Sequence, residues 1–329
     1  MFFVKAIVNT EYGSPDVLRY EEVEKPVPKA GEVLVRVHAS SINAGDWHLL
    51  RADPWMVRLM FGLTKPKISI LGADIAGTVE SVGEGVTTFA AGDAVYGDIS
   101  NAGFGAFAEY AVAPESMLAK KPDTLTFEEA ATVPAASVTA LQALRDHGKI
   151  AAGEKVLING ASGGVGSFAV QLAKHFGAEV TGVCSTRNLE RVHALGAEHV
   201  IDYTQEDFAA SGAQYDLIHA ANGNRSLFDY KRALLPKGRY IMSGGEMGQF
   251  YQIMLMGAIV SMMGSRKMSN MLVSPNGEDL AFVSGLIDGG EVVPVIDRVY
   301  PLAEVPDAIR YMEAGHVQGK IAISMGVAD

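Results

Sequence analysis

The chain has 329 residues and a formal net charge of −11 at pH 7. This length is too great for one small core and predicts about two domains of ordinary size. The negative charge argues against nucleic acid as a partner, because affinity for a polyanion depends on many cationic contacts.

Cysteine content and hydropathy exclude further classes of protein. Cys184 is the only cysteine, which rules out an internal disulfide and a tetrathiolate zinc site. No apolar run approaches the roughly 20 residues that cross a bilayer. Residues 1–13 read as a strand and not as a signal peptide. We therefore expect a cytoplasmic protein without a membrane partner.

The first 120 residues contain short β-prone runs separated by Gly, Pro and Asp, which predicts a mostly β domain. The expected strands are Lys5–Val8, Val33–Ala39, Gly77–Val82, Ala94–Tyr96 and Ala106–Val112.

From about Thr126 the pattern changes to an Ala-rich helix that Pro134 interrupts, and strands and helices then alternate. This alternation predicts an α/β domain with a doubly wound parallel sheet covered on both faces. The expected strands are 156–159, 180–184, 199–201, 217–220 and 239–243, and the expected helices are 164–176, 187–195, 204–210 and 225–234. After about residue 265 isolated strands return, with one helix at 305–315. The predicted domain boundaries divide the chain into residues 1–125, 126–265 and 266–329.

Residues 252–263 form a methionine-rich, uncharged segment. This segment can be a helix of the core or of a subunit interface. Because methionine also lines adaptable pockets, it can alternatively be a wall of a substrate cavity.

A glycine-rich turn follows the first strand of the predicted α/β domain. Residues 156–166 read VLINGASGGVG, in which Gly163 and Gly166 occupy the second and third positions of the G-x-G-x-x-G fingerprint and Ala161 the first. Gly163 lets the backbone approach a pyrophosphate, Gly166 lets the helix pack on the strand, and the helix N-terminus holds the anion. The turn predicts a dinucleotide site made by Ala161, Ser162, Gly163, Gly164, Val165 and Gly166.

The residues after the second strand of this domain indicate which dinucleotide is bound. Enzymes that bind NAD usually carry Asp or Glu about 20 residues after the glycine turn. Here strand 180–184 runs into Ser185-Thr186-Arg187-Asn188, with no acid before Glu190. Arg187 can pair with a 2′-phosphate and the Ser185 hydroxyl can donate to it, which predicts NADPH. Alternatively, Arg187 begins the next helix as a solvated charge.

These motifs resemble the medium-chain dehydrogenase/reductase superfamily, in its zinc-free quinone oxidoreductase branch. The resemblance extends over nearly the whole chain. It depends on LGADIAGTVESVGEGV at 71–86, GDAVYG at 92–97, GAFAEYAVAP at 105–114, the Ala/Pro/Thr helix at 128–144, the glycine turn, LGAEHVIDY at 195–203 and PLAEVPDAIRYMEAGHVQGK at 301–320. It implies a GroES-like β domain formed by both ends of the chain, with a Rossmann domain inserted between them and an active site in the cleft.

Zinc-binding members of this superfamily hold a catalytic metal on Cys, His and Cys. At these positions the chain has Asn43, Ala73 and a residue near Ala135, which do not complete a tetrahedral ligand set. We therefore expect no metal here. Without a Lewis acid, hydride transfer to a quinone or an enone is favoured, because its charge spreads over a conjugated system that weaker donors can hold.

The resemblance also implies candidates for the chemistry. The Asn43 amide can donate to a substrate carbonyl or to the cofactor ribose, or simply lie in a turn. His48 stands where related enzymes often have tyrosine and can donate the proton that completes reduction, or can be an exposed helix residue. Asp46 is the third catalytic candidate, although ordering the loop or the ribose suits it better than acting as an acid.

Further residues are expected to bind the cofactor. Thr139 matches a position that touches the nicotinamide end, and Tyr203 lies where related NADPH enzymes contact the 2′-phosphate. Ser243 and Gly244 follow a strand and can place backbone groups against the carboxamide. Lys320, in the last motif, is also expected to contact the cofactor.

We therefore expect a zinc-independent, NADPH-dependent oxidoreductase that transfers a hydride to quinones or α,β-unsaturated carbonyl compounds. Two alternatives stay open: a metal-free NADP-dependent alcohol or ketone dehydrogenase, and a non-catalytic NADPH-binding protein. An unpaired sheet edge in the inserted domain would favour a homodimer.

Overall fold

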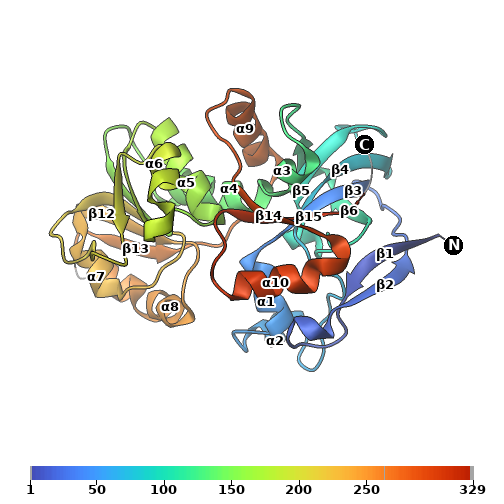
Figure 1. Cartoon of the computed structure of the whole chain (residues 1–329), viewed down its shortest axis with the longest axis horizontal. Coiled ribbons are helices and arrows are strands. Elements are labelled where there is room, and N and C mark those ends of the chain that lie inside the picture. Colours follow the sequence, from blue (N-terminus) through green and yellow to red (C-terminus); the bar gives the residue numbers. More distant parts are fainter. Residues whose placement is uncertain (1, 263, 327–329) are drawn as a thin grey trace. The chain divides into compact units, whose positions relative to one another are not determined.

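Two large sheets of different topology divide the chain into two units in this computed structural model, which describes residues 2–262 and 264–326 (Figure 1). Unit 1 comprises Met1–Ala135, Ser274–Gly290 and Pro294–Asp329, and unit 2 comprises Ala136–Val273 and Glu291–Val293. No helix of the described residues is long and apolar enough to cross a bilayer.

Unit 1 is built on a mainly antiparallel sheet in the order β14-β15-β3-β4-β5-β7, with β6 paired to β3. Its strands are β3 (Glu32–Ile42), β4 (Asp74–Val82), β5 (Ala94–Asp98), β6 (Tyr110–Pro114), β7 (Leu118–Lys120), β14 (Ile296–Pro301) and β15 (Lys320–Ser324), and β1 (Phe3–Val8) pairs separately with β2 (Arg19–Glu24). Because β15 pairs with β3, both ends of the chain build one domain.

The helices of unit 1 are short and connect or cover these strands. They are α1 (Ala44–Arg51), α2 (Val57–Phe61), α3 (Phe127–Ala131), α9 (Gly277–Asp288) and α10 (Val305–Glu313), with the 3₁₀ turns η1 (Pro15–Val17), η2 (Ser100–Ala102), η3 (Glu115–Met117) and η6 (Leu302–Glu304). Helix α3 begins at a capping box, in which the Thr126 hydroxyl accepts from the N–H of Glu129 and the Glu129 carboxylate accepts from the N–H of Thr126.

Unit 2 is a parallel sheet in the order β10-β9-β8-β11-β12-β13. Its strands are β8 (Lys155–Asn159), β9 (Glu179–Cys184), β10 (His199–Asp202), β11 (Tyr215–Ala220), β12 (Leu234–Met242) and β13 (Lys267–Asn270). Its helical segments are α4 (Pro134–Leu141), which begins at the boundary, the π-helical turn η4 (Gln142–His147), α5 (Gly164–His175), the 3₁₀ turn η5 (Thr186–Asn188), α6 (Leu189–Ala194), α7 (Leu227–Arg232) and α8 (Met247–Met262). The strand order reverses between β8 and β11. The carboxyl ends of these two strands therefore form the topological switch point, where α/β folds bind ligands.

The fold class predicted from the sequence is confirmed. The boundaries between the two compact units lie 8 to 10 residues further along the chain than the change in sequence pattern indicated. The observed boundaries lie at 135/136 and 273/274, whereas the sequence indicated 125/126 and 265/266. Helix α3 packs against β3 and so belongs to unit 1, and β13 pairs with β12 and so belongs to unit 2. Residues 291–293 return to unit 2, where the Gln171 amide bonds both backbone groups of Val293.

The expected helix at 204–210 is absent, and turns occupy these residues. The Asp202 carboxylate accepts from the N–H of Thr204, and the Asp207 carboxylate accepts from the N–H of Ala209. These local side-chain bonds compete with a helix for the backbone donors and hold the segment in turns.

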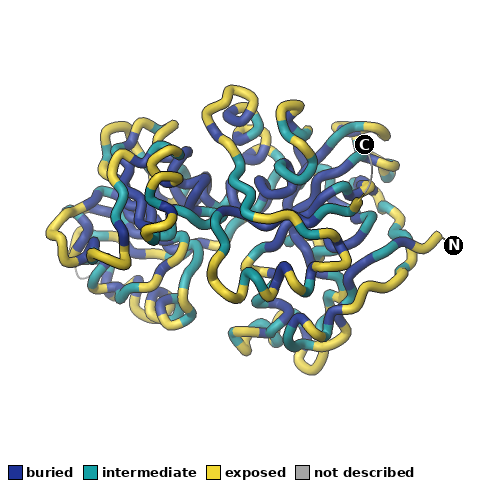
Figure 2. Tube along the Cα trace, viewed as in Figure 1, coloured by how far each residue is buried: buried dark blue, intermediate teal, exposed yellow. Residues whose placement is uncertain are grey.

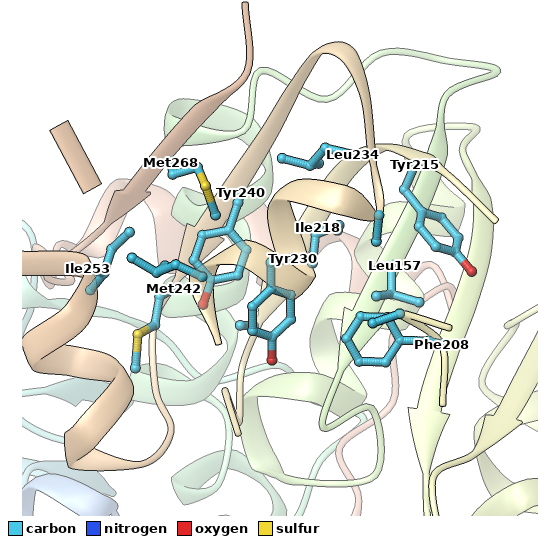
Figure 3. Packing of buried hydrophobic residues seen from close by; sticks show 14 of the residues in the cluster. Leu157, Phe208, Tyr215, Ile218, Tyr230, Leu234, Tyr240, Met242, Ile253 and Met268 are labelled. Atoms are coloured by element: carbon cyan, nitrogen blue, oxygen red, sulfur yellow. The ribbon is translucent and has the colours of Figure 1, made fainter. Parts of the chain in front are cut away.

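The core of unit 2 contains aromatic rings that pack in tilted pairs beside the central strands (Figure 3). The ring centroid of Tyr230 lies 4.6 Å from that of Tyr240 and 5.6 Å from that of Phe208. The sheet strands of both units are largely buried, and exposed residues gather in the connecting loops (Figure 2). This burial gives the loops after the strands a rigid support.

Helix α8 contains most of the methionine-rich segment, and its two sides differ in exposure. Ile253 and Val260 join the core of unit 2, which agrees with the expectation of a core helix. Met254 and Leu255 are 46% and 68% exposed, so the opposite side is apolar but not covered. Met263, the last residue of the predicted segment, lies outside the described residues.

Candidate active site

The turn between β8 and α5 is closed by backbone contacts that require glycine at two positions. Gly160 has a φ of +86°, and its N–H and that of Ala161 both donate to the carbonyl oxygen of Val183. A Cβ on Gly166 would lie only 2.0 Å from the carbonyl oxygen of Gly160. Gly166 therefore packs the helix on the strand, and Gly160 makes the tight turn that the fingerprint assigns to its first glycine.

Gly163 differs, because the chain itself leaves room for a side chain there. It has a φ of −82° at the position before α5, and an added Cβ would meet only the carbonyl oxygen of Gly160, at 3.5 Å. Ser162, Gly164 and Val165 beside it are half-buried. The first N–H groups of α5 point outward from this turn and carry the positive end of the helix dipole. The turn thus has the open cradle that a pyrophosphate needs.

The residues predicted to contact a 2′-phosphate come together at the ends of β9 and β10. These strands are parallel neighbours with Asp202 opposite Cys184, and the N–H of Tyr203 donates to the carbonyl oxygen of Cys184. Ser185 is half-buried, while Arg187 is exposed and Tyr203 is 50% exposed. One carboxylate also lies here.

This carboxylate belongs to Asp202, which was not predicted from the sequence. It accepts from the Thr186 hydroxyl at 2.5 Å and from the hydroxyl and N–H of Thr204 at 2.8 and 2.9 Å. The Thr186 bond is the largest cause that lowers the pKa of Asp202. Asp202 thus joins the turn that carries Arg187 to the turn that carries Tyr203.

At the carboxyl end of β12, the backbone N–H groups of Ser243 and Gly244 both donate to the carbonyl oxygen of Ala220. Any backbone contact that they make with a carboxamide therefore has to use carbonyl groups. The Ser243 hydroxyl lies 2.8 Å from Nε2 of His219, whose pKa burial lowers to about 4, so the imidazole is neutral at pH 7. Thr139 is half-buried on α4.

In unit 1, Asp74 is the centre of a buried hydrogen-bond network. One carboxylate oxygen accepts from the Ser41 hydroxyl at 2.6 Å, from Nδ2 of Asn43 at 2.8 Å and from Nζ of Lys320 at 3.3 Å. The other oxygen accepts from the N–H of Ala135 at 2.8 Å. Asn43 and Ala135, which lie at and near two of the positions that the resemblance assigns to zinc ligands, thus both donate to one carboxylate. Ala73, at the remaining position, directly precedes Asp74 in the chain.

Lys320 has all three ammonium hydrogens engaged in unit 1. Nζ donates to the carbonyl oxygen of Ile42 at 3.1 Å, to Oδ1 of Asn43 at 2.5 Å and to Asp74. The residue is 5% exposed. An ammonium group has only three donors, and here all three are directed to atoms of unit 1. Direct contact between Lys320 and the cofactor stays a prediction.

Asp46 orders the beginning of α1. It is fully buried, and its carboxylate accepts from the N–H of Asn43 at 2.8 Å and from the N–H of Gly72 at 2.9 Å. Burial raises the pKa of Asp46 to about 7. These contacts tie the α1 loop to the residues before β4, which agrees with a loop-ordering role.

His48 lies half-buried on α1 with a defined tautomer. Its Nδ1 is 2.6 Å from the carbonyl oxygen of Asp53, which can only accept a hydrogen bond, so Nδ1 carries a hydrogen. The ring also packs edge-on against Trp47, with centroids 4.5 Å apart. Nε2 is therefore the ring nitrogen that can form a hydrogen bond with a ligand or transfer a proton to it.

Three residues in these sites were missed by reasoning from the sequence. Asp74 directly follows Ala73 in LGAD, and an acid beside a lost zinc ligand was a usable signal. Gly160 precedes the fingerprint by one residue, and Asp202 follows a short strand. The role of Asp202 depends on the pairing of two strands that are far apart in sequence.

Two family models match the chain. An alcohol dehydrogenase GroES-like domain matches residues 29–123, and a zinc-binding dehydrogenase domain matches residues 195–323. The chloroplast envelope quinone oxidoreductase homolog of Arabidopsis thaliana is 36% identical over 326 residues, which cover 96% of each chain. The chain belongs to the quinone oxidoreductase-like branch of the medium-chain dehydrogenase/reductase superfamily.

Other relatives of this quinone oxidoreductase-like protein agree with that membership. The structure of the quinone oxidoreductase from Coxiella burnetii superposes with a TM-score of 0.87 at 30% identity, covering 98% of this chain and all of the other. The chloroplastic NADPH-dependent alkenal/one oxidoreductase of Arabidopsis thaliana is 34% identical over 97% of this chain and 79% of its own. Membership of this family of oxidoreductases implies a nicotinamide cofactor, which the cradle at Gly163 fits.

Proposed function

We propose that this protein is a zinc-independent, NADPH-dependent oxidoreductase that reduces quinones or α,β-unsaturated carbonyl compounds. The observation that carries the proposal is the Asn43 amide, which is held by Asp74 and Lys320 at the position where zinc-dependent members have a thiolate. The names of the relatives quoted above support both acceptor classes.

A hydrogen-bond donor in place of a metal restricts the acceptor. Bound NADPH supplies the hydride. Asn43 donates an N–H to the substrate carbonyl oxygen and so stabilises the charge that develops there. This donor is weaker than a metal ion, so it suits an acceptor that delocalises the charge. We therefore favour quinones and enones over simple ketones.

His48 is the proposed proton donor. Because Nδ1–H is already donated to Asp53, only Nε2 can deliver a proton, and it can do so only from the imidazolium form. Asp46 holds the α1 loop that carries both Asn43 and His48, and it does not act on the substrate itself.

For the cofactor, we propose that residues 161–166 hold the pyrophosphate and that Arg187, Ser185 and Tyr203 hold the 2′-phosphate. The open cradle at Gly163 and the adjacency of the β9 and β10 turns support this assignment. Thr139, Ser243 and Gly244 remain candidates for the nicotinamide end.

We also propose a homodimer. Strand β13 ends the sheet of unit 2, and within the described residues it pairs with β12 alone. An unpaired edge of this kind can pair with a second copy. Light scattering after size exclusion tests this proposal, and a monomer at micromolar concentration would contradict it. A cytoplasmic location stays a prediction, because several relatives are named as chloroplastic or mitochondrial.

The function is tested by NADPH oxidation with three panels: quinones, enones, and simple aldehydes and ketones. We expect turnover with quinones or enones, and a loss of at least tenfold in kcat for Asn43→Ala with these acceptors. Turnover that is restricted to simple carbonyls, together with NADP⁺-dependent oxidation of alcohols, would favour the dehydrogenase alternative. Tight NADPH binding without turnover on any panel would favour a non-catalytic protein.

A further inference from the structure

We infer that Asp74 and Lys320 are positioning residues that fix the orientation of the Asn43 side-chain amide. This inference rests on the proposed role of Asn43. It adds two residues that do not touch the substrate but decide which atom of the amide is presented to it.

The amide has opposite partners at its two ends. Nδ2 donates to the carboxylate of Asp74 at 2.8 Å, and Oδ1 accepts from the ammonium of Lys320 at 2.5 Å. Rotating the amide by 180° would place its oxygen against a carboxylate and its NH₂ group against an ammonium. Both charge-assisted bonds would then become repulsive contacts. The charges of the two partners therefore fix the orientation of the amide.

This arrangement leaves one hydrogen of the amide for a ligand. Nδ2 carries two hydrogens, of which one is donated to Asp74. The oxygen already accepts from the Lys320 ammonium, so the half-buried Asn43 side chain offers a ligand the second N–H of Nδ2. A donor is what a carbonyl that gains negative charge requires.

Asp74 and Lys320, which bind the two ends of the amide, are themselves buried and hydrogen-bonded by other residues. The side-chain exposures of Lys320 and Asp74 are 6% and 0%. Ile42 binds the lysine, and Ser41 and Ala135 bind the aspartate. Because each ion is buried, loss of one partner leaves the other as an uncompensated charge, so single variants are expected to be destabilised. The test therefore removes both charges together.

The test combines Asp74→Asn with Lys320→Met. Methionine replaces the unbranched stem of lysine without its ammonium donors. An amide at position 74 offers both a donor and an acceptor, so it accommodates either orientation of Asn43. We expect kcat with a quinone or an enone to fall at least tenfold, while the dissociation constant of NADPH stays within about twofold. In an Asn43→Ala background, the same two changes should alter kcat by no more than about twofold, because the group that they orient is absent.

An equal fall in kcat in both backgrounds would overturn the inference. So would wild-type kcat in the Asp74→Asn/Lys320→Met variant when Asn43→Ala alone is impaired, and that result would leave the proposed function intact. If Asn43→Ala itself keeps wild-type kcat, the proposed role of Asn43 is wrong. The inferred positioning role of Asp74 and Lys320 then fails as well.

A measurement on the wild-type protein does not depend on how the variants fold. The Asn43 side-chain amide signal is identified in an ¹H–¹⁵N spectrum by its disappearance in Asn43→Ala. One of its two protons should lie clearly downfield of an ordinary asparagine amide, because it is bonded to a buried carboxylate, and the other should shift when an acceptor analogue is added. Two protons at ordinary positions would contradict the proposed orientation.

Discussion

The backbone N–H of Tyr203 donates to the carbonyl oxygen of Cys184 at 3.1 Å, which places the turn after β10 beside the turn after β9. Arg187 and Tyr203 lie 16 positions apart in the chain, but these turns present them on the same edge of the sheet. The Thr186 hydroxyl bonds the Asp202 carboxylate at 2.5 Å and joins the turns a second time.

The first prediction concerns the choice of cofactor. Arg187→Ala should weaken NADPH binding about ten- to a hundredfold, because a charge-assisted hydrogen bond contributes roughly 1.5–3 kcal/mol. NADH, which lacks the 2′-phosphate, should bind nearly unchanged. Dissociation constants of both cofactors measure this effect, with Arg191→Ala as a control that removes an exposed arginine from the following helix. Equal losses for the two cofactors, or a wild-type preference for NADH, would refute the assignment.

The second prediction separates the two glycines of the turn. Gly163→Ala should fold normally and bind NADPH at least tenfold more weakly, because its Cβ meets only an ordinary contact within the chain and otherwise occupies the phosphate cradle. Gly166→Ala should lower the thermal midpoint of the apoprotein, since its Cβ would lie 2.0 Å from a backbone oxygen. Gly248→Ala is the control, because nothing lies near its Cβ. Unchanged NADPH affinity in folded Gly163→Ala would show that the phosphates lie elsewhere.

The third prediction is that activity does not require zinc. The resemblance assigns the zinc-ligand positions to Asn43, Ala73 and a residue near Ala135, and none of these supplies a thiolate or an imidazole. Asn43 and Ala135 instead donate N–H groups to Asp74. Prolonged treatment with a chelator should leave the quinone or enone reductase rate unchanged. Elemental analysis of the purified protein should find far less than one zinc per chain. If the protein contains one zinc per chain and loses both zinc and activity on treatment with the chelator, activity depends on zinc and the prediction is wrong.

The fourth prediction concerns stability and pH. Burial, followed by the neighbouring charge of Asp74, raises the pKa of Asp98 to about 6. The native state then binds a proton that the unfolded chain has already released, so the stabilisation from Asp98 is fully present below about pH 4 and is lost as the pH rises through 6. Asp98→Asn removes this titration, while its side-chain oxygen can still accept the N–H of Ser100.

The free energy of unfolding is measured with urea at pH 4.5 and 7.5 for both proteins. The value for wild type minus that for Asp98→Asn should fall by about 2 kcal/mol between these conditions. A difference that stays constant, or that increases with pH, would show that Asp98 is ionised in the native protein throughout this range.

Local pattern in the sequence determined the class of fold and the position of the nucleotide turn. Glycines at 163 and 166 between an apolar run and an amphipathic stretch are a signal within 11 residues, because a strand, a tight turn and a helix N-terminus are each formed by neighbours in the chain. The lack of Cys and His at Asn43, at Ala73 and near Ala135 could likewise be predicted once the ordered motifs had indicated the family.

Pairing between distant segments decided the rest. The contacts of the Lys320 ammonium could not be predicted from the sequence, because the pairing of β15 with β3 delivers it to Ile42, Asn43 and Asp74. The roles of Asp74 and Asp202 depend on partners in other elements, such as Lys320 for Asp74 and Thr186 for Asp202. Likewise, α3 and β13 were assigned to the wrong side of a boundary, because the sequence shows where a pattern changes but not which sheet a segment packs against. Local propensity depends on neighbours in the chain, whereas hydrogen bonding and burial of a side chain depend on neighbours in space.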